Sequence, residues 1–267
     1  AWDAIIAPHQ AGLTDARETH LAAAPLTPSE AYHHYTAAQA GVVDSARFLI
    51  AFTIVPSLQS ATTKLHALAA RGDANGLRTL LDSGEVLEID EPSPSCGSPA
   101  LLLAASIGSA ATVRVLLEAG AAPEGIGRAG VTPLMAASAM GHEEVVVALI
   151  EGGASINHPH AFGGTTAIHF AAEMGRGNLI RTLCMNGADA EAIKTNGGRP
   201  LHTASDADQH EAVMALTSPP CNATVDALMN GDTTALYLAA QRGFVNTTRA
   251  LLDSGSLIDF VMPRGGY

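Results

Sequence analysis

The chain has 267 residues, of which 47% are apolar and 15% charged, and its formal net charge at pH 7 is −12. This acidic balance argues against a nucleic-acid partner, because affinity for the phosphate backbone comes from clustered lysine and arginine, and Lys64 and Lys194 are the only lysines. The longest apolar run, residues 48–55, is shorter than the roughly 20 residues that a membrane-spanning helix needs, so we expect no membrane insertion.

The first 55 residues, rich in Ala, Pro and His, predict a helical N-terminal cap, and residues 56–267 predict a separate domain. The chain begins at Ala1 without a charged-then-apolar leader, so we expect an intracellular protein, cytoplasmic or organellar after removal of a presequence. The three cysteines, Cys96, Cys184 and Cys221, match no metal-ligand or redox spacing, and their odd number argues against a disulfide framework. A reducing compartment is therefore favoured.

A ten-residue phrase recurs along the rest of the chain. Its clearest copies run from Thr132 to Gly141, from Thr166 to Gly175 and from Thr234 to Gly243. Looser copies span residues 63–72, 99–108 and 199–208, and a degenerate copy spans residues 32–41 of the N-terminal cap. The closing residues of these phrases are separated by 31, 36, 33, 34, 33 and 35 residues. A fixed period close to 33 predicts a solenoid of repeated supersecondary units.

The phrase and its period resemble the ankyrin repeat, whose signature is Thr-Pro-Leu-His-x-Ala in a unit of about 33 residues. The resemblance covers roughly residues 62–262. It implies an all-α solenoid of stacked helix-turn-helix units with short β-hairpin-like fingers between them. In each unit a Thr would cap the first helix, the closing Gly would turn the chain, and a Gly twelve residues later would end the second helix.

Two segments depart from this pattern. After Leu216 the repeat has no glycine stop and continues Ser218-Pro-Pro-Cys-Asn222, where proline is expected to end the helix and lengthen the loop. The final residues, Arg264 to Tyr267, look like the start of another finger. We therefore expect either further repeats or an apolar face that meets a partner.

Several motifs that suggest chemistry have a simpler structural explanation in this context. Gly125-x-Gly127-x-x-Gly130 matches a dinucleotide fingerprint but lacks the preceding strand and βαβ unit, so it predicts a finger turn. Arg71-Gly72-Asp73 matches an adhesion tripeptide but is expected to be a closing glycine followed by a helix cap. No serine or cysteine has a recognisable catalytic signature, and we expect no catalytic residue and no cofactor.

The histidines are expected to be structural. His66, His169 and His202 occupy the histidine position of the repeat signature, where a ring nitrogen can satisfy backbone groups of an adjoining finger. The pairs His33-His34 and His158-Pro-His160 bring no third ligand at useful spacing, so we expect no metal. Cys184 stands at an apolar-pair position and predicts a small buried residue. The sequons at Asn222 and Asn246 would accept a glycan only in a secreted protein.

The family resemblance implies a non-catalytic protein–protein interaction module, an adaptor or scaffold, that binds a protein partner in its concave groove and at its finger tips. The matching positions at the ends of the first helices are Arg71, Ile107, Met140, Glu173, Met174 and Arg242. The matching finger positions are Arg128, Val131, His160, Phe162, Lys194 and Asn196. Phe162, beside a Gly-Gly tip, is the expected anchor.

Three residues in the middle of this set, Ile107, Met140 and Met174, have two interpretations. They form an apolar stripe exposed in the groove, or they lie half-buried between the first helices. The function has alternatives too. The chain could be a permanently bound structural subunit of a larger multiprotein assembly, or the ankyrin part of a larger enzyme whose site lies elsewhere.

Overall fold

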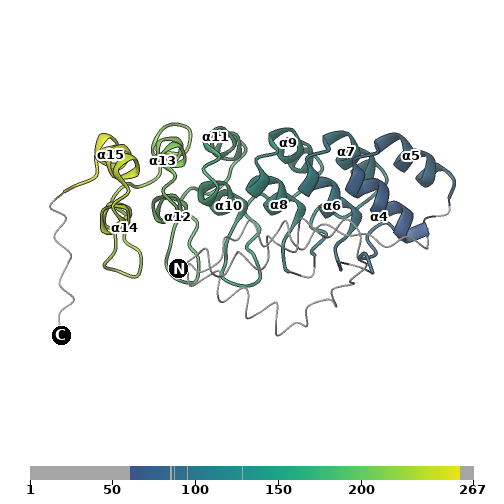
Figure 1. Ribbon diagram of the computed structural model, residues 1–267, viewed down its shortest axis with the longest axis horizontal. Helices are drawn as coiled ribbons and strands as arrows, with labels where there is room; N and C mark the ends of the chain where they lie inside the picture. The colour runs from purple at the N-terminus through teal and green to yellow at the C-terminus, as the bar shows by residue number, and fades with distance from the viewer. Residues whose placement is uncertain (1–60, 85, 87, 95, 128, 259–267) are drawn as a thin grey trace, which may run out of the picture.

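Residues 61–84, 86, 88–94, 96–127 and 129–258 are described by a computed structural model, shown in Figure 1. Within these residues, twelve helices form an elongated row of pairs. The first helices of the pairs are α4 (Ala61–Arg71), α6 (Ala100–Ile107), α8 (Pro133–Met140), α10 (Ala167–Glu173), α12 (Pro200–Asp206) and α14 (Ala235–Arg242). The second helices are α5 (Ala74–Asp82), α7 (Ala110–Glu118), α9 (Glu143–Glu151), α11 (Gly177–Met185), α13 (His210–Thr217) and α15 (Val245–Asp253). The predicted all-α solenoid is confirmed.

The helices lie in two layers. Figure 1 shows the first helices in one layer, the second helices in the other, and the connecting loops extending past the first helices. The loops that join one pair to the next, residues 83–99, 119–132, 152–166, 186–199 and 218–234, are the fingers. The predicted N-terminal cap, its degenerate repeat and residues 259–267 lie outside the described residues.

The core is continuous along the row. Small residues such as Ala104, Ala105 and Ala171 are fully buried and let neighbouring first helices approach closely, while Leu149 and Leu183 fill the space between second helices. The contacts between helices run from each pair to its neighbours, as in α4 with α6 and α7 with α9. Each pair therefore buries its apolar side only against the pairs beside it.

The turn inside each pair depends on a left-handed backbone residue. The closing glycines have φ between 68° and 84°, a region that glycine enters without steric cost. Asp208, which replaces glycine in the fifth pair, has φ 57°. Its Oδ1 accepts a hydrogen bond of 2.7 Å from the Thr247 hydroxyl in the next pair, which helps to hold this conformation. The sequence-based assignment of the closing positions is confirmed.

Side-chain caps begin the helices as the sequence indicates. Thr132 caps α8 and accepts a hydrogen bond from the Met135 N–H, and Pro133 takes the first helical position. Asp73 caps α5 and accepts from the Gly76 N–H at 2.9 Å. The adhesion-like tripeptide is thus a turn followed by a helix cap, as expected.

In the fifth pair α13 ends at Thr217, before the segment Ser218-Pro-Pro-Cys-Asn222, as the sequence indicates. Asn222, with φ 50°, supplies the left-handed residue after α13, and the Ala223 N–H donates to the Leu216 carbonyl at 2.8 Å. In the preceding pair, Ala188 N–H donates to the Leu183 carbonyl at 2.9 Å. The stop is therefore present but comes two residues later in the chain. The absence of the glycine and the longer loop are confirmed, and Asn222 takes the place of the glycine.

The argument against a disulfide was wrong. Cys184, at the end of α11, is bonded to Cys221 in the inserted turn, with their Cα atoms 5.3 Å apart, and Cys96 is the free thiol. Counting cysteines could not reveal this pair. The two cysteines are 37 residues apart in the sequence, about four more than one repeat period, and in a regular stack two residues at that separation would not be in contact. The insertion after α13 brings Cys221 back beside α11.

Two signature histidines are buried in the neutral form. His169 Nδ1 accepts from the Thr166 N–H at 3.2 Å, and burial, helped by the charge of Lys194, lowers the pKa of His169 from 6.5 to about 3. His202 Nδ1 accepts from the Arg199 N–H, its Nε2 lies 3.0 Å from the Ala227 carbonyl, and burial lowers its pKa as well. Contact with an adjoining finger, expected for these histidines, is confirmed at His202.

Acid should weaken the fold through His169. Below pH 6.5 the unfolded chain binds a proton at this residue that the native chain does not bind until about pH 3, so stability is full above pH 6.5 and falls as pH drops. Urea denaturation of wild type and His169→Asn from pH 7 to 4.5 should show a shallower loss in the variant. The expected difference is at most about 1.4 kcal/mol per pH unit. Replacing the exposed His210 by Asn is the control; equal slopes for wild type and His169→Asn would contradict the assignment.

Candidate protein-binding surface

The residues just before the closing positions of the turns form one row along the solenoid, because the same position recurs in every pair. This row consists of Arg71, Ile107, Met140, Met174, Ala207 and Arg242, one beside each turn. Together with the finger tips it makes up the first-helix face. In α6, α8 and α12 most other residues of the first helix are buried, and in α8 every residue from Pro133 to Ala139 is buried, whereas Tyr237 of α14 is 48% exposed. The row is therefore the main part of the first helices that a partner can touch.

The centre of the first-helix face is apolar, and its three members differ in exposure. Ile107 is 39% exposed, whereas Met140 and Met174 are partly buried. Met174 packs against a small apolar cluster, the finger cluster, which lies apart from the main core. The finger cluster consists of Leu102, Val131, Met135, Ala136, Ala139 and Phe170. Both interpretations of the predicted stripe thus hold in part: Ile107 is exposed, and Met174 is half-buried.

A backbone hydrogen bond closes each finger, and no strand forms in the described part of the chain. These bonds, between 2.8 and 3.1 Å, join Ser93 N to Ser98 O, Gly127 N to Val131 O, His160 N to Thr165 O, Lys194 N to Gly198 O and Met229 N to Thr233 O. The glycines of the dinucleotide-like motif serve this turn, with Gly130 at φ 79°.

The tip of the third finger carries an exposed aromatic ring. Phe162 is 47% exposed, and its ring centroid lies 5.9 Å from that of His160, which in turn lies 6.3 Å from that of Phe170 in the finger cluster. A β-carbon placed on Gly130 would lie 3.6 Å from the Phe162 ring. Phe162 therefore lies against the neighbouring finger, with its ring in contact with that of His160.

Two finger residues expected on the surface are not there. Val131 is 4% exposed and belongs to the finger cluster, and His160 is also 4% exposed. His160 Nε2 lies 2.9 Å from the Ala129 carbonyl, and its Nδ1 accepts from the Phe162 N–H. Both side chains fix one finger against the next and are removed from the proposed surface. Arg128 lies outside the described residues, and Asn196 is exposed, with its Oδ1 accepting from the Gly198 N–H.

Charged residues continue the first-helix face towards α14, and they are paired with one another. The Arg242 guanidinium, at the end of α14, lies 2.7 Å from Asp206 Oδ1, at the end of α12 in the neighbouring pair. Burial lowers the pKa of Lys194, while the carboxylates of Glu173 and Asp206 act in the opposite direction. The charges in this part of the face therefore neutralise each other, although the chain as a whole is acidic. At the other end of the row Arg71 is exposed.

A ladder of polar side chains sets the spacing of the fingers. In each finger one carboxylate or amide oxygen accepts a hydrogen bond from a backbone N–H of the next finger. The pairs are Asp90 with Ala122, Glu124 with Ser155, Asn157 with Asp189, Glu191 with Thr224, and Asp226 with Leu257. The sequence analysis missed these residues. Their signal is a polar acceptor recurring at the repeat period, but its identity varies between Asp, Glu and Asn.

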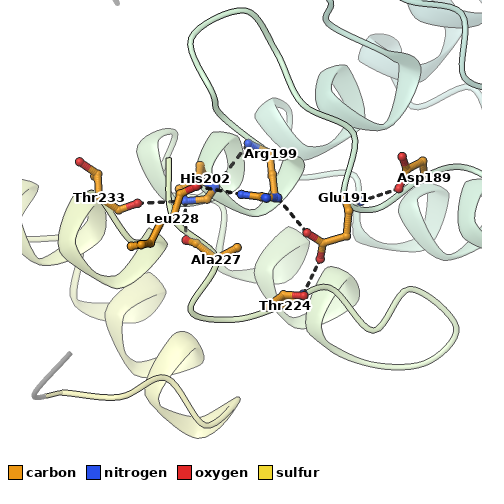
Figure 2. A network of polar contacts seen from close by, with 8 residues as sticks. All are labelled: Asp189, Glu191, Arg199, His202, Thr224, Ala227, Leu228 and Thr233. Carbon is orange, nitrogen blue, oxygen red and sulfur yellow. Dashed lines mark hydrogen bonds and ion pairs between the residues drawn. The ribbon is translucent and has the colours of Figure 1, made fainter. Parts of the chain in front are cut away.

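The fourth finger has the densest polar network, shown in Figure 2. Glu191 Oε1 accepts from the Thr224 N–H at 2.6 Å, and its Oε2 lies 2.9 Å from Arg199 Nε. Arg199 stands where other repeats have a capping Thr, and it also donates to the Leu228 carbonyl at 2.9 Å. Figure 2 shows Arg199 and His202 reaching across to the finger that precedes α14. This network fixes the fingers on either side of the inserted turn.

Other chemistry finds no support in the described residues. They contain no group of three or more His, Cys, Asp or Glu side chains that could hold a metal ion, and His158 instead lies 3.7 Å from Glu124. None of the helices they form is long and apolar enough to cross a membrane.

These features define a solenoid of stacked helix pairs with a row of helix ends and finger tips on one face. The chain belongs to the ankyrin repeats family, whose model matches three overlapping segments, residues 65–160, 101–194 and 168–262. It is similar to the solved human ASB11 ankyrin repeat domain, with a TM-score of 0.64, 28% identity, and coverage of 76% of this chain and 88% of that one. Ankyrin repeats generally mediate protein–protein interaction.

Two curated relatives match this chain over part of a longer sequence. The E3 ubiquitin-protein ligase XBAT33 of Arabidopsis thaliana is 29% identical over 190 residues, covering 71% of this chain and 35% of the relative. The B-cell lymphoma 3 protein homolog of Mus musculus is 30% identical over 148 residues, covering 54% of this chain and 33% of the relative. The chain spans about a third of the length of these two relatives.

Loss of the Glu191 contacts should destabilise the solenoid. Glu191→Ala leaves the Thr224 N–H and the Arg199 guanidinium without this carboxylate, and we expect the free energy of unfolding to fall by about 1–3 kcal/mol. Glu191→Gln keeps an acceptor for Thr224 and should lose less. Chemical denaturation measures both, with the exposed Glu88→Ala as the control, expected to change stability by less than about 0.5 kcal/mol. An Ala variant as stable as the control would show that the contact contributes nothing.

Proposed function

We propose that this protein is a non-catalytic adaptor or scaffold that binds a segment of a partner protein on its first-helix face. The observation that carries the proposal is the set of exposed apolar side chains there, called the apolar patch below. Ile107 and Phe162 are 39% and 47% exposed, and Met140 lies partly exposed in the row between Ile107 and Met174. Flexible methionine side chains and rigid aromatic rings that are held in position by their neighbours are typical of binding hot spots.

The supports beneath this patch favour a preorganised surface. Phe162 is backed by His160 and Phe170, and Met174 packs on the finger cluster, so a partner would meet side chains that are already placed. Placement before binding reduces the conformational entropy that association costs. Lys194, Glu173 and Arg242 belong to the proposed surface at its charged end, where they would select orientation more than affinity.

A second candidate is a permanently bound subunit of a larger assembly. It is favoured by exposed apolar side chains away from the first-helix face, with Met185 of α11 67% exposed and Val245 of α15 66% exposed. A permanent interface buries about 2,000 Å² or more and is more apolar than a transient one. The area buried in the complex, from its structure, would separate the two candidates.

Removing the apolar patch should abolish partner binding without unfolding the protein. A partner recovered by affinity purification and mass spectrometry would be purified, and its affinity measured by calorimetry for wild type and Ile107→Ser/Met140→Ser/Phe162→Ser. We expect a loss of about 3 kcal/mol or more, on the order of a hundredfold, because a few central residues carry most binding energy. The melting temperature should change little, since all three side chains are at least partly exposed.

The matched control carries serine at three exposed apolar positions of the second helices, Met185, Met214 and Leu252. This control should bind as wild type does. If the control loses affinity and the first-helix variant keeps it, the partner binds the opposite layer, and the proposal is wrong.

A further inference from the structure

The inserted turn after α13 is attached covalently to the preceding repeat. In other pairs the second helix ends in a five-residue step, as from Leu183 to Ala188, closed by one backbone hydrogen bond. In the fifth pair the same bond joins Leu216 and Ala223, so two extra residues bulge out. Cys221 lies in this bulge and is bonded to Cys184, at the end of α11. The fourth helix pair, α10 with α11, is thus covalently linked to the segment that leads into the sixth pair, α14 with α15.

Apart from the disulfide, the contacts of the segment from Thr217 to Thr233 with the rest of the chain lie mainly in its later half. Glu191 and Arg199 hold its later half through Thr224 and Leu228, as Figure 2 shows. Its first half contains Pro219 and Pro220, which have no backbone N–H to donate. On this first half the Thr217 hydroxyl lies 2.8 Å from the Ser254 hydroxyl, and the disulfide joins Cys221 to Cys184. The disulfide is the stronger of these two links.

Both bonded cysteines are partly exposed, so a thiol can reach them. We propose that the Cys184–Cys221 bond is a redox-operated staple that sets the local stability of repeats five and six. A dithiol, either a small molecule or a dithiol protein, reduces the bond in two steps. One thiolate of the reductant attacks a sulfur of the bond, forms a mixed disulfide and releases one cysteine; the second thiolate of the reductant then attacks its own sulfur in the mixed disulfide and releases the other cysteine. The reductant gives two electrons and two protons and becomes a disulfide, and Cys184 and Cys221 become thiols.

The staple would regulate one end of the first-helix face. Repeats five and six contribute Asp206 and Arg242, whose ion pair spans α12 and α14, and the inserted turn lies on the path between their helix pairs. In a solenoid each repeat is stabilised by its neighbours, so loosening one connection lowers the stability of the adjoining repeats first. The link to binding rests on the proposed function; the change in local stability does not.

Thiol counting tests whether the bond forms. The chain has three cysteines. After equilibration with oxidised glutathione, alkylation in denaturant should find one free thiol, on Cys96, and after dithiothreitol it should find three. Peptide mapping should recover Cys184 and Cys221 as one cross-linked peptide before reduction. Three free thiols in the glutathione-treated protein would overturn the proposal.

Hydrogen exchange and thermal melting test what the bond does. Reduction should lower the melting temperature by about 5–10 °C, because a closed loop of this length restrains the unfolded chain. Amide exchange in α13, α14 and α15 should become at least about tenfold faster, while exchange in α6 to α9 stays the same. Cys96→Ser should respond to dithiothreitol as wild type does, and Cys184→Ser/Cys221→Ser should not respond. No change in exchange between oxidised and reduced wild type would overturn the proposal, whether or not the double variant folds.

These readouts use the protein without a partner, so the two proposals fail separately. If amide exchange does not depend on reduction, the redox proposal fails, but the proposal of a binding site on the first-helix face is unaffected. If Ile107→Ser/Met140→Ser/Phe162→Ser binds normally, its redox response should still match that of wild type.

Discussion

Burial between neighbouring helix pairs is the constraint on which the rest of this structure depends. Helices of seven to eleven residues are too short to be stable alone, and each pair covers its apolar side only by stacking on the next. The demand is heaviest on the first helices, which are covered by two neighbours, by their own second helix and by the fingers. In α8, for example, the buried residues include Ser138 as well as the apolar ones. On α8 this leaves only Met140, at the end of the helix, partly exposed, whereas α14 at the end of the described stack also exposes Tyr237.

The same constraint determines which features the sequence reveals. A unit that stacks on copies of itself repeats its spacing, so the period, the capping Thr132 and the left-handed closing residues, Asp208 included, could be predicted from sequence. Which finger residues are exposed could not be predicted from the sequence. Val131 and His160 look like loop residues, but each finger packs on the next, and their burial depends on that contact. Phe162, at the tip, was predicted correctly as exposed because the glycines beside it offer no core.

Features that break the period were the hardest to predict. The Cys184–Cys221 bond depends on a two-residue insertion whose path is known only in three dimensions. The finger ladder was missed for a different reason: its acceptors keep the period, but Asp90, Glu124 and Asn157 share a function rather than an amino-acid type. A search for recurring acceptors, instead of recurring residues, would have found them.

The ladder also changes what the acidic composition means. A net charge of −12 suggests attraction for a basic partner, yet several carboxylates already accept backbone hydrogen bonds between fingers, and Asp206 is paired on the first-helix face. An exposed ion pair contributes about 0–1 kcal/mol, so it holds the surface only weakly and orients a partner more than it binds one. Under the proposed function, affinity on this face would come mainly from its apolar side chains, of which Phe162 and Ile107 are exposed. The paired charges beside these side chains would discriminate among partners that share the same apolar residues.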